Sequence, residues 1–175
     1  PGSPWDPETT MGPSTTKPQY ELVKGLIDDA VARGATVVTG GNALDRPGYF
    51  IEPTILTGVT PDMKVYQDET FGPMVPVIPF RTDDEAIQIA NDTEYGLSAG
   101  VISRDERRAL DIVNRLETGN CHVNCSSVND EPHVPFGGFK ASGVGKHGGR
   151  WSLETFTETR WITLDRGGRP YPPMF

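Results

Sequence analysis

Residues 142–149, SGVGKHGG, carry the glycine spacing of a dinucleotide-binding loop, with Gly143, Gly145 and Gly148 in a G-x-G-x-x-G pattern. Such a loop holds a pyrophosphate where it follows a strand and opens a helix, because the helix N-terminus then faces the phosphates. The residues before Gly143 do not have a strand pattern, and no clear amphipathic helix follows Gly148. We therefore interpret this segment as a structural loop in which glycine lets backbone pass close to backbone.

Two further kinds of site lack a required residue. A P-loop needs lysine where this chain has Val144. His122, His133 and His147 lack the i,i+4 spacing of paired metal ligands, and no carboxylates cluster with them. The sequence predicts neither a P-loop nor a metal site.

The two cysteines are weak candidates for a nucleophile. Cys121 and His122 are adjacent on a predicted strand, so their side chains point to opposite faces and cannot form a couple. Cys125 lies just past that strand, but its neighbours at residues 130–131 are acidic, and no nearby basic group would activate the thiol. Two cysteines are too few for a disulfide framework, so we expect reduced thiols and a cytoplasmic protein.

The segment QDETFGP, residues 67–73, allows two interpretations. Glu69 could accept hydrogen bonds from a pair of sugar hydroxyls while Phe71 offers a flat apolar face to a ring. Alternatively, Glu69 is a helix-capping carboxylate beside a core phenylalanine. Residue spacing alone does not separate the two.

Composition and charge exclude several classes of partner. The chain has 175 residues, 16 Lys and Arg against 24 Asp and Glu, and a formal net charge of -8. Clustered basic residues, which binding to nucleic acid or anionic membranes requires, are absent from the sequence. No apolar run reaches the roughly 18 residues of a membrane span.

The pattern of apolar residues predicts an α/β fold. A helix should begin at the capping box of Thr16 and end near Gly34. Pro53 marks residues 49–56 as an edge or irregular strand. Further helices should open at Thr82 and Ser103, between strands at residues 74–80, 97–103 and 120–124. This β-α-β-α-β order predicts a parallel sheet, with ligands beyond its carboxyl edge near residues 125–136.

Several linked motifs resemble the C-terminal part of the NAD(P)-dependent aldehyde dehydrogenase superfamily over essentially the whole chain. They occur in family order as GYFIEPTIL, DETFGPMVPV, ANDTEYGLSAGVISRD, ETGNCHVN and PFGGFKASGVGKHGG. The version VNDEPHVPFGG is most similar to the branch that acts on aromatic aldehydes such as benzaldehyde, salicylaldehyde and vanillin.

The resemblance implies a cofactor, NAD or NADP, and a small-molecule aldehyde substrate. By family likeness, Glu69 would hydrogen-bond the nicotinamide ribose and Phe71 would pack near the nicotinamide. The aldehyde pocket would include Ser127, Asn129 and Phe136.

The resemblance also implies a domain division. Residues 1–156 would be the distal part of the catalytic domain, and residues 157–175 an oligomerisation strand and tail. The strand, TRWITLD, would pair with another subunit in a homo-oligomer.

In the family, a cysteine thiolate attacks the aldehyde to form a thiohemiacetal, hydride passes to the nicotinamide, and a water activated by glutamate releases the acid. The resemblance places that cysteine, the glutamate, the oxyanion-stabilising asparagine and the Rossmann-type domain upstream of this chain. We therefore expect no catalytic residue here and no activity of the chain alone. The alternative is a non-catalytic oligomerisation or interaction module of the same fold.

Overall fold

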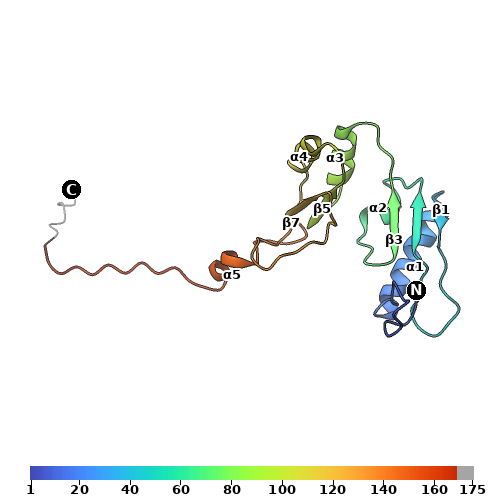
Figure 1. Cartoon of the computed structure of the whole chain (residues 1–175), viewed down its shortest axis with the longest axis horizontal. Coiled ribbons are helices and arrows are strands. Elements are labelled where there is room, and N and C mark those ends of the chain that lie inside the picture. The colour runs from blue at the N-terminus through green and yellow to red at the C-terminus, as the bar shows by residue number, and fades with distance from the viewer. Residues whose placement is uncertain (169–175) are drawn as a thin grey trace. The chain divides into compact units, whose positions relative to one another are not determined.

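The computed structural model describes residues 1–168, which form two compact units (Figure 1). Unit 1 is Pro1–Thr93, and unit 2 begins at Glu94. Each unit has its own helices and strands and is described separately below.

Unit 1 is organised around α1 (Lys17–Ala32), which begins where the capping motif predicts. The Thr16 hydroxyl accepts a hydrogen bond from the backbone N–H of Gln19 at 3.4 Å, and the helix gives way to Gly34 in the left-handed region at φ 102°. The buried residues of α1 recur at helical spacing, so they form one apolar stripe: Val23, Leu26, Ile27 and Ala30.

The sheet of unit 1 has the order β1 (Thr36–Thr39), β2 (Thr54–Thr57) and β3 (Met74–Val77). β2 is antiparallel to β1 and parallel to β3, so it is the central strand. Of the two alternatives predicted from Pro53, the edge strand is wrong, because β2 is central and begins directly after this proline. The irregular strand is confirmed, since residues 49–56 hold only an isolated bridge at Ile51 before β2, and the register of the β1-β2 pair shifts.

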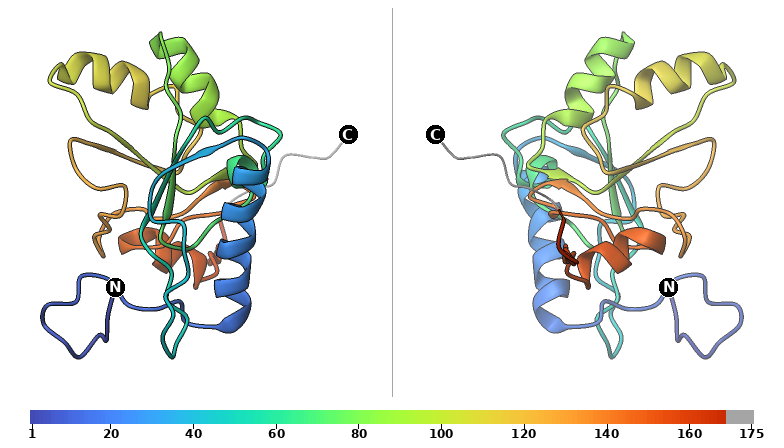
Figure 2. Two further views of the ribbon diagram at one scale, coloured as in Figure 1. Left: turned by 90° about the vertical axis from the view of Figure 1, so that its right-hand side faces the viewer. Right: turned by 90° about the vertical axis from the view of Figure 1, so that its left-hand side faces the viewer.

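The core of unit 1 lies between α1 and this sheet. The apolar stripe of α1 packs in one cluster with Leu56 of β2 and Met74 of β3. Figure 2 shows α1 as the long blue helix of the first unit. Two further helices complete the unit: α2 (Lys64–Gln67) and α3 (Asp83–Asn91), the latter capped by Thr82 as predicted.

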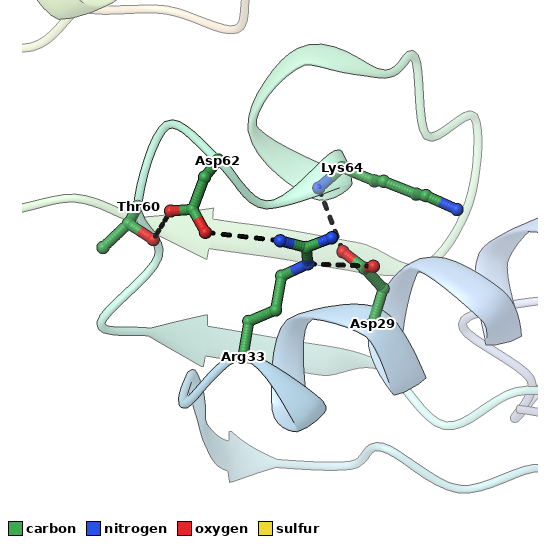
Figure 3. A network of polar contacts seen from close by, with 5 residues as sticks. All are labelled: Asp29, Arg33, Thr60, Asp62 and Lys64. Carbon is green, nitrogen blue, oxygen red and sulfur yellow. Dashed lines mark hydrogen bonds and ion pairs between the residues drawn. The ribbon is translucent and has the colours of Figure 1, made fainter.

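A polar network ties the end of α1 to the start of α2 (Figure 3). The Asp29 carboxylate accepts from the backbone N–H of Lys64 at 3.1 Å and pairs with the Arg33 guanidinium at 3.1 Å. These two contacts, the Lys64 N–H first, hold the pKa of Asp29 below its ordinary value. Arg33 also reaches Asp62, whose pKa is lowered mainly by the Thr60 hydroxyl. The network therefore connects the C-terminal turn of α1 to residues 60–64 at the start of α2.

Unit 2 contains one parallel strand pair and one short antiparallel pair. β5 (Ser98–Val101) and β6 (Asn120–Val123) are parallel, with α4 (Glu106–Val113) as the connection between them. β4 (Tyr95–Gly96) pairs antiparallel with β7 (Phe139–Lys140), and α5 (Gly149–Thr155) follows. α4 begins later than predicted, since Asp105 rather than Ser103 is its N-cap and accepts from the Arg108 N–H at 3.1 Å.

The α/β class is confirmed, and the predicted parallel sheet is confirmed only in part, because the strands form small mixed sheets within each unit. β3 pairs with β2 in unit 1, whereas β5 and β6 pair with each other in unit 2. The β5-α4-β6 part of the prediction is confirmed. The order of elements along a chain limits which strands can pair and does not specify the partners.

The predicted oligomerisation strand is not shown. Residues 157–168 contain no strand, and residues 169–175 of the predicted tail lie outside the described part. A strand whose ladder partner belongs to another subunit has nothing to pair with in one chain. The division at residue 156 stays a prediction. Among residues 1–168, no helix has the length and apolar character needed to cross a membrane.

Candidate functional site

Glu69 and Phe71 lie in the loop that joins α2 to β3. The Gln19 side chain of α1 holds this loop from behind, because its Nε2 donates to the carbonyl of Thr70 at 2.8 Å and to that of Phe71 at 3.1 Å. Phe71 itself has φ 42°, a left-handed conformation that is uncommon outside glycine. Strain of this kind persists where the surroundings fix it, and the two amide contacts do so.

The two hydrogen bonds from Gln19, which we call the Gln19 clamp, go to backbone carbonyls only. The side chains of Glu69 and Phe71 therefore remain able to contact a ligand. The Phe71 ring is 78% exposed, and the Glu69 side chain is exposed as well. Within residues 1–168, the Glu69 carboxylate has no hydrogen bond or ion pair. The interpretation of Phe71 as a core residue is therefore wrong. Glu69 lies after α2, so it does not cap the N-terminus of that helix.

A pocket of about 380 Å³ adjoins this loop. Phe71 lines it together with residues 11–16, Gln19, Gly72 and Pro73, whereas Glu69 does not. Gly72 is required at its position because a Cβ there would clash with the fully buried Val23 side chain. One side of the loop therefore packs against the core of unit 1, and the other side lines the pocket.

The three residues predicted for the aldehyde pocket lie in unit 2, after β6. Ser127 is exposed, and its carbonyl accepts a hydrogen bond from the Ser98 hydroxyl. Asn129 is also exposed and places its Nδ2 3.8 Å from Cys125 Sγ. Phe136 is half-buried and exchanges two backbone hydrogen bonds with His147, at 2.8 and 2.7 Å. These backbone hydrogen bonds fix the position of Phe136, whereas Ser127 and Asn129 lie on an exposed loop.

The predicted close approach of backbone to backbone is confirmed at Gly148 of the glycine pattern, whereas a Cβ at Gly143 or Gly145 would meet no atom within 4 Å. A Cβ at Gly119 would clash with the carbonyl of Gly137, and one at Gly148 would clash with the carbonyl of Val134. Lys146 connects the backbone at Gly119 to the backbone at Gly137, because its Nζ donates to the carbonyls of Gly137 at 2.5 Å and Gly119 at 3.3 Å. These glycines position β6 and the loop that follows it.

Neither cysteine is placed like an activated nucleophile. Cys121 is half-buried with Sγ 2.8 Å from the Thr118 hydroxyl, and Cys125 is exposed; both thiols are free. His122 Nε2 is buried without a hydrogen-bond partner among the described residues. No group of three or more His, Cys, Asp or Glu within residues 1–168 could hold a metal ion.

Two positioning residues were missed by sequence reasoning. Gln19 fits the capping box at the start of α1, which accounts for the residue without reference to the loop at residues 70–71. Lys146 lies inside the G-x-G-x-x-G pattern, and that pattern was interpreted from its glycines alone. The structure places Glu69 and Phe71 together in unit 1, and Ser127, Asn129 and Phe136 together in unit 2.

Comparison with known proteins shows similarity to one family over nearly the whole chain. The aldehyde dehydrogenase family model matches residues 1–162. A vanillin dehydrogenase of Pseudomonas fluorescens is 46% identical over 171 residues, which cover 98% of this chain and 35% of that protein.

Solved structures give the same result. A salicylaldehyde dehydrogenase from Pseudomonas putida, complexed with salicylaldehyde, matches with a TM-score of 0.86 and 42% identity over 93% of this chain and 33% of that one. A Mycobacterium tuberculosis aldehyde dehydrogenase complexed with NAD+ matches with a TM-score of 0.88 and 35% identity over 97% of this chain and 35% of that one. The chain spans about a third of the length of these relatives. By sequence and by structure, it belongs to the aldehyde dehydrogenase family.

Proposed function

We propose that this chain forms the nicotinamide-facing part of an enzyme that oxidises an aromatic aldehyde to the carboxylic acid with NAD+ or NADP+. The observation that carries the proposal is the family match over residues 1–162, combined with 46% identity to a vanillin dehydrogenase. The similar salicylaldehyde dehydrogenase supports an aromatic substrate. When bound, the cofactor would accept the hydride.

The loop at residues 68–73 fits the ribose and ring of such a cofactor. Glu69 is an exposed carboxylate without a partner in the described chain, so it can accept hydrogen bonds from two vicinal hydroxyls. The exposed Phe71 ring can pack against a flat heterocycle at the adjoining pocket. The Gln19 clamp would keep both in position before the cofactor binds.

The aldehyde would be bound by the segment after β6. Phe136 offers an aromatic face on a backbone fixed by pairing with His147, which suits an aromatic ring. Ser127 and Asn129 offer hydroxyl and amide groups to substituents of that ring.

In this proposal the attacking thiolate belongs to upstream polypeptide, so neither Cys121 nor Cys125 forms the thiohemiacetal. We also propose that residues 157–175 pair with a second copy of the chain, because Trp161, Ile162 and Leu164 are 91%, 76% and 73% exposed. Both thiols are free, which supports a cytoplasmic location. The same exposed residues favour the second candidate function, a non-catalytic oligomerisation module.

An activity assay separates the two functions. The isolated chain should produce no NAD(P)H from vanillin or benzaldehyde. A chimera in which this chain replaces the matching 171 residues of the Pseudomonas fluorescens vanillin dehydrogenase should do so. An inactive chimera that folds and oligomerises would favour the module, and turnover by the isolated chain that Cys125→Ser abolishes would place the nucleophile here.

A further inference from the structure

The chain turns back toward β5 where β6 ends. Asn124 has φ 59°, in the left-handed region, which asparagine adopts more readily than most residues. Its backbone N–H donates to the carbonyl of Val101 at 2.9 Å, and its side-chain Oδ1 accepts from the N–H of Ser103 at 2.8 Å. These contacts join the start of residues 124–129, which we call the β6 loop, to the end of β5.

The β6 loop lies on the face of β5 opposite to α4. Cys121 of β6 pairs with Ala99 of β5, and its Sγ lies 4.0 Å from the carbonyl of Val113 in α4. Cys121 and Ala99 therefore face α4. Side chains alternate along a strand, so Ser98 and Gly100 face the other way.

Two features of this face of β5 hold the β6 loop. The Ser98 hydroxyl donates a hydrogen bond to the carbonyl of Ser127. Gly100 has no side chain, and a Cβ there would already lie 3.5 Å from the Cys125 carbonyl oxygen and 3.6 Å from the Ser127 nitrogen. The loop backbone is therefore close enough to Gly100 that a branched side chain at this position would displace it.

Contacts within the β6 loop make it a single turn. The Ser126 hydroxyl accepts from the N–H of Val128 at 3.1 Å, and the Asn129 Nδ2 lies 3.8 Å from the Cys125 Sγ. The hydrogen bond that Ser98 makes in the middle of this turn therefore acts on the position of Asn129 as well.

We propose that Ser98 is a positioning residue that sets how strongly the enzyme distinguishes aromatic aldehydes by their ring substituents. The inference rests on the proposed function, in which Ser127 and Asn129 contact those substituents. Ser98 acts by holding the Ser127 carbonyl, so that the hydroxyl of Ser127 and the amide of Asn129 stay in place. Vanillin carries a hydroxyl and a methoxy group that can use these contacts, whereas benzaldehyde has no ring substituent.

The test compares Ser98→Ala with two controls in the chimera. The ratio of kcat/KM for vanillin to kcat/KM for benzaldehyde should fall about fivefold in Ser98→Ala, as expected for one neutral hydrogen bond. Ser98→Thr keeps the hydroxyl and should leave this ratio within about twofold of its original value. Ser103→Ala should do the same, because it removes the hydroxyl of another half-buried serine, one that accepts from the N–H of Asp105.

Hydrogen exchange of the isolated chain gives a second readout, which needs no activity. The amides of residues 125–129 should exchange at least about threefold faster in Ser98→Ala and at an unchanged rate in Ser103→Ala. Gly100→Val adds bulk against the loop and removes no hydrogen bond. It should change the exchange rate and the aldehyde ratio in the same directions as Ser98→Ala, whereas Gly100→Ala should change neither.

Three results would overturn this inference alone. Equal losses of kcat/KM for both aldehydes would mean that Ser98 only supports the fold. Unchanged exchange in Ser98→Ala would mean that its hydrogen bond does not hold the loop, and faster exchange with an unchanged ratio would mean that the loop does not select the aldehyde. An unsubstituted chimera without turnover would instead contradict the proposed function, while exchange would still show whether Ser98 holds the loop.

Discussion

Replacing Glu69 with alanine in the chimera is expected to lower kcat/KM for the cofactor by about 10- to 100-fold. Hydrogen bonds to a charged group contribute about 1.5–3 kcal/mol, and each 1.4 kcal/mol is a factor of ten. The effect should be large because the carboxylate is exposed and has no competing partner within the described residues. Initial rates measured against cofactor concentration at saturating aldehyde give this value.

Asp68→Ala is the matched control for Glu69→Ala. It removes an exposed carboxylate from the preceding position of the same loop. The proposal expects Asp68→Ala to change kcat/KM by less than about threefold. Equal effects of the two substitutions, or no effect of either, would remove Glu69 from the cofactor site.

Leu56→Ala should lower the free energy of unfolding of the chain by about 2–5 kcal/mol, the cost of a large cavity in a packed core. Leu56 is 0% exposed and belongs to the cluster that joins α1 to the sheet. A domain is stabilised by only about 5–15 kcal/mol, so the loss would be a large fraction of the total. Urea unfolding followed by circular dichroism measures it.

The neighbouring residue provides the control for Leu56→Ala. Ile55 is of similar size, but its side chain lies on the face of the sheet opposite to α1 and is 38% exposed, so Ile55→Ala should cost less than about 1.5 kcal/mol in the isolated chain. A cost as large as that of Leu56→Ala would mean that both faces of the sheet are already packed.

The helices were predictable because their signals are local. Thr16 and Thr82 cap α1 and α3 as the sequence indicates, since a hydroxyl three residues before a free N–H needs no distant partner. α4 shows the limit of this reasoning. Ser103 and Asp105 both satisfy the local rule, and the Ser103 hydroxyl instead accepts from the N–H of Asp105.

The strand pairing was only partly predictable, because partners are chosen over long separations. The β5-α4-β6 connection is short and gives a parallel pair, as expected. By contrast, β4 and β7 are two residues each and have no periodicity that a sequence reading could detect. Gly96 and Phe139 pair across more than forty residues, and the Gly96 N–H also donates to the Ser142 hydroxyl at 2.9 Å.

The sequence predicted which residues form the candidate site, but it did not predict the contacts that hold them in position. Glu69 and Phe71 stand out by their spacing and by resemblance to the family. The contacts that fix their loop were not visible, because Gln19 reaches it across 51 residues of sequence. The left-handed conformation of Phe71 was equally hidden, since no local signal marks a non-glycine residue there.

Turnover of the chimera with Cys121→Ser and Cys125→Ser together tests most directly whether the reactive sulfur lies outside these 175 residues. We expect aldehyde-dependent NAD(P)H production within about twofold of the unsubstituted chimera, because neither thiol is placed as a nucleophile. A loss of turnover at an unchanged melting temperature would contradict it and put the attacking thiol on this chain.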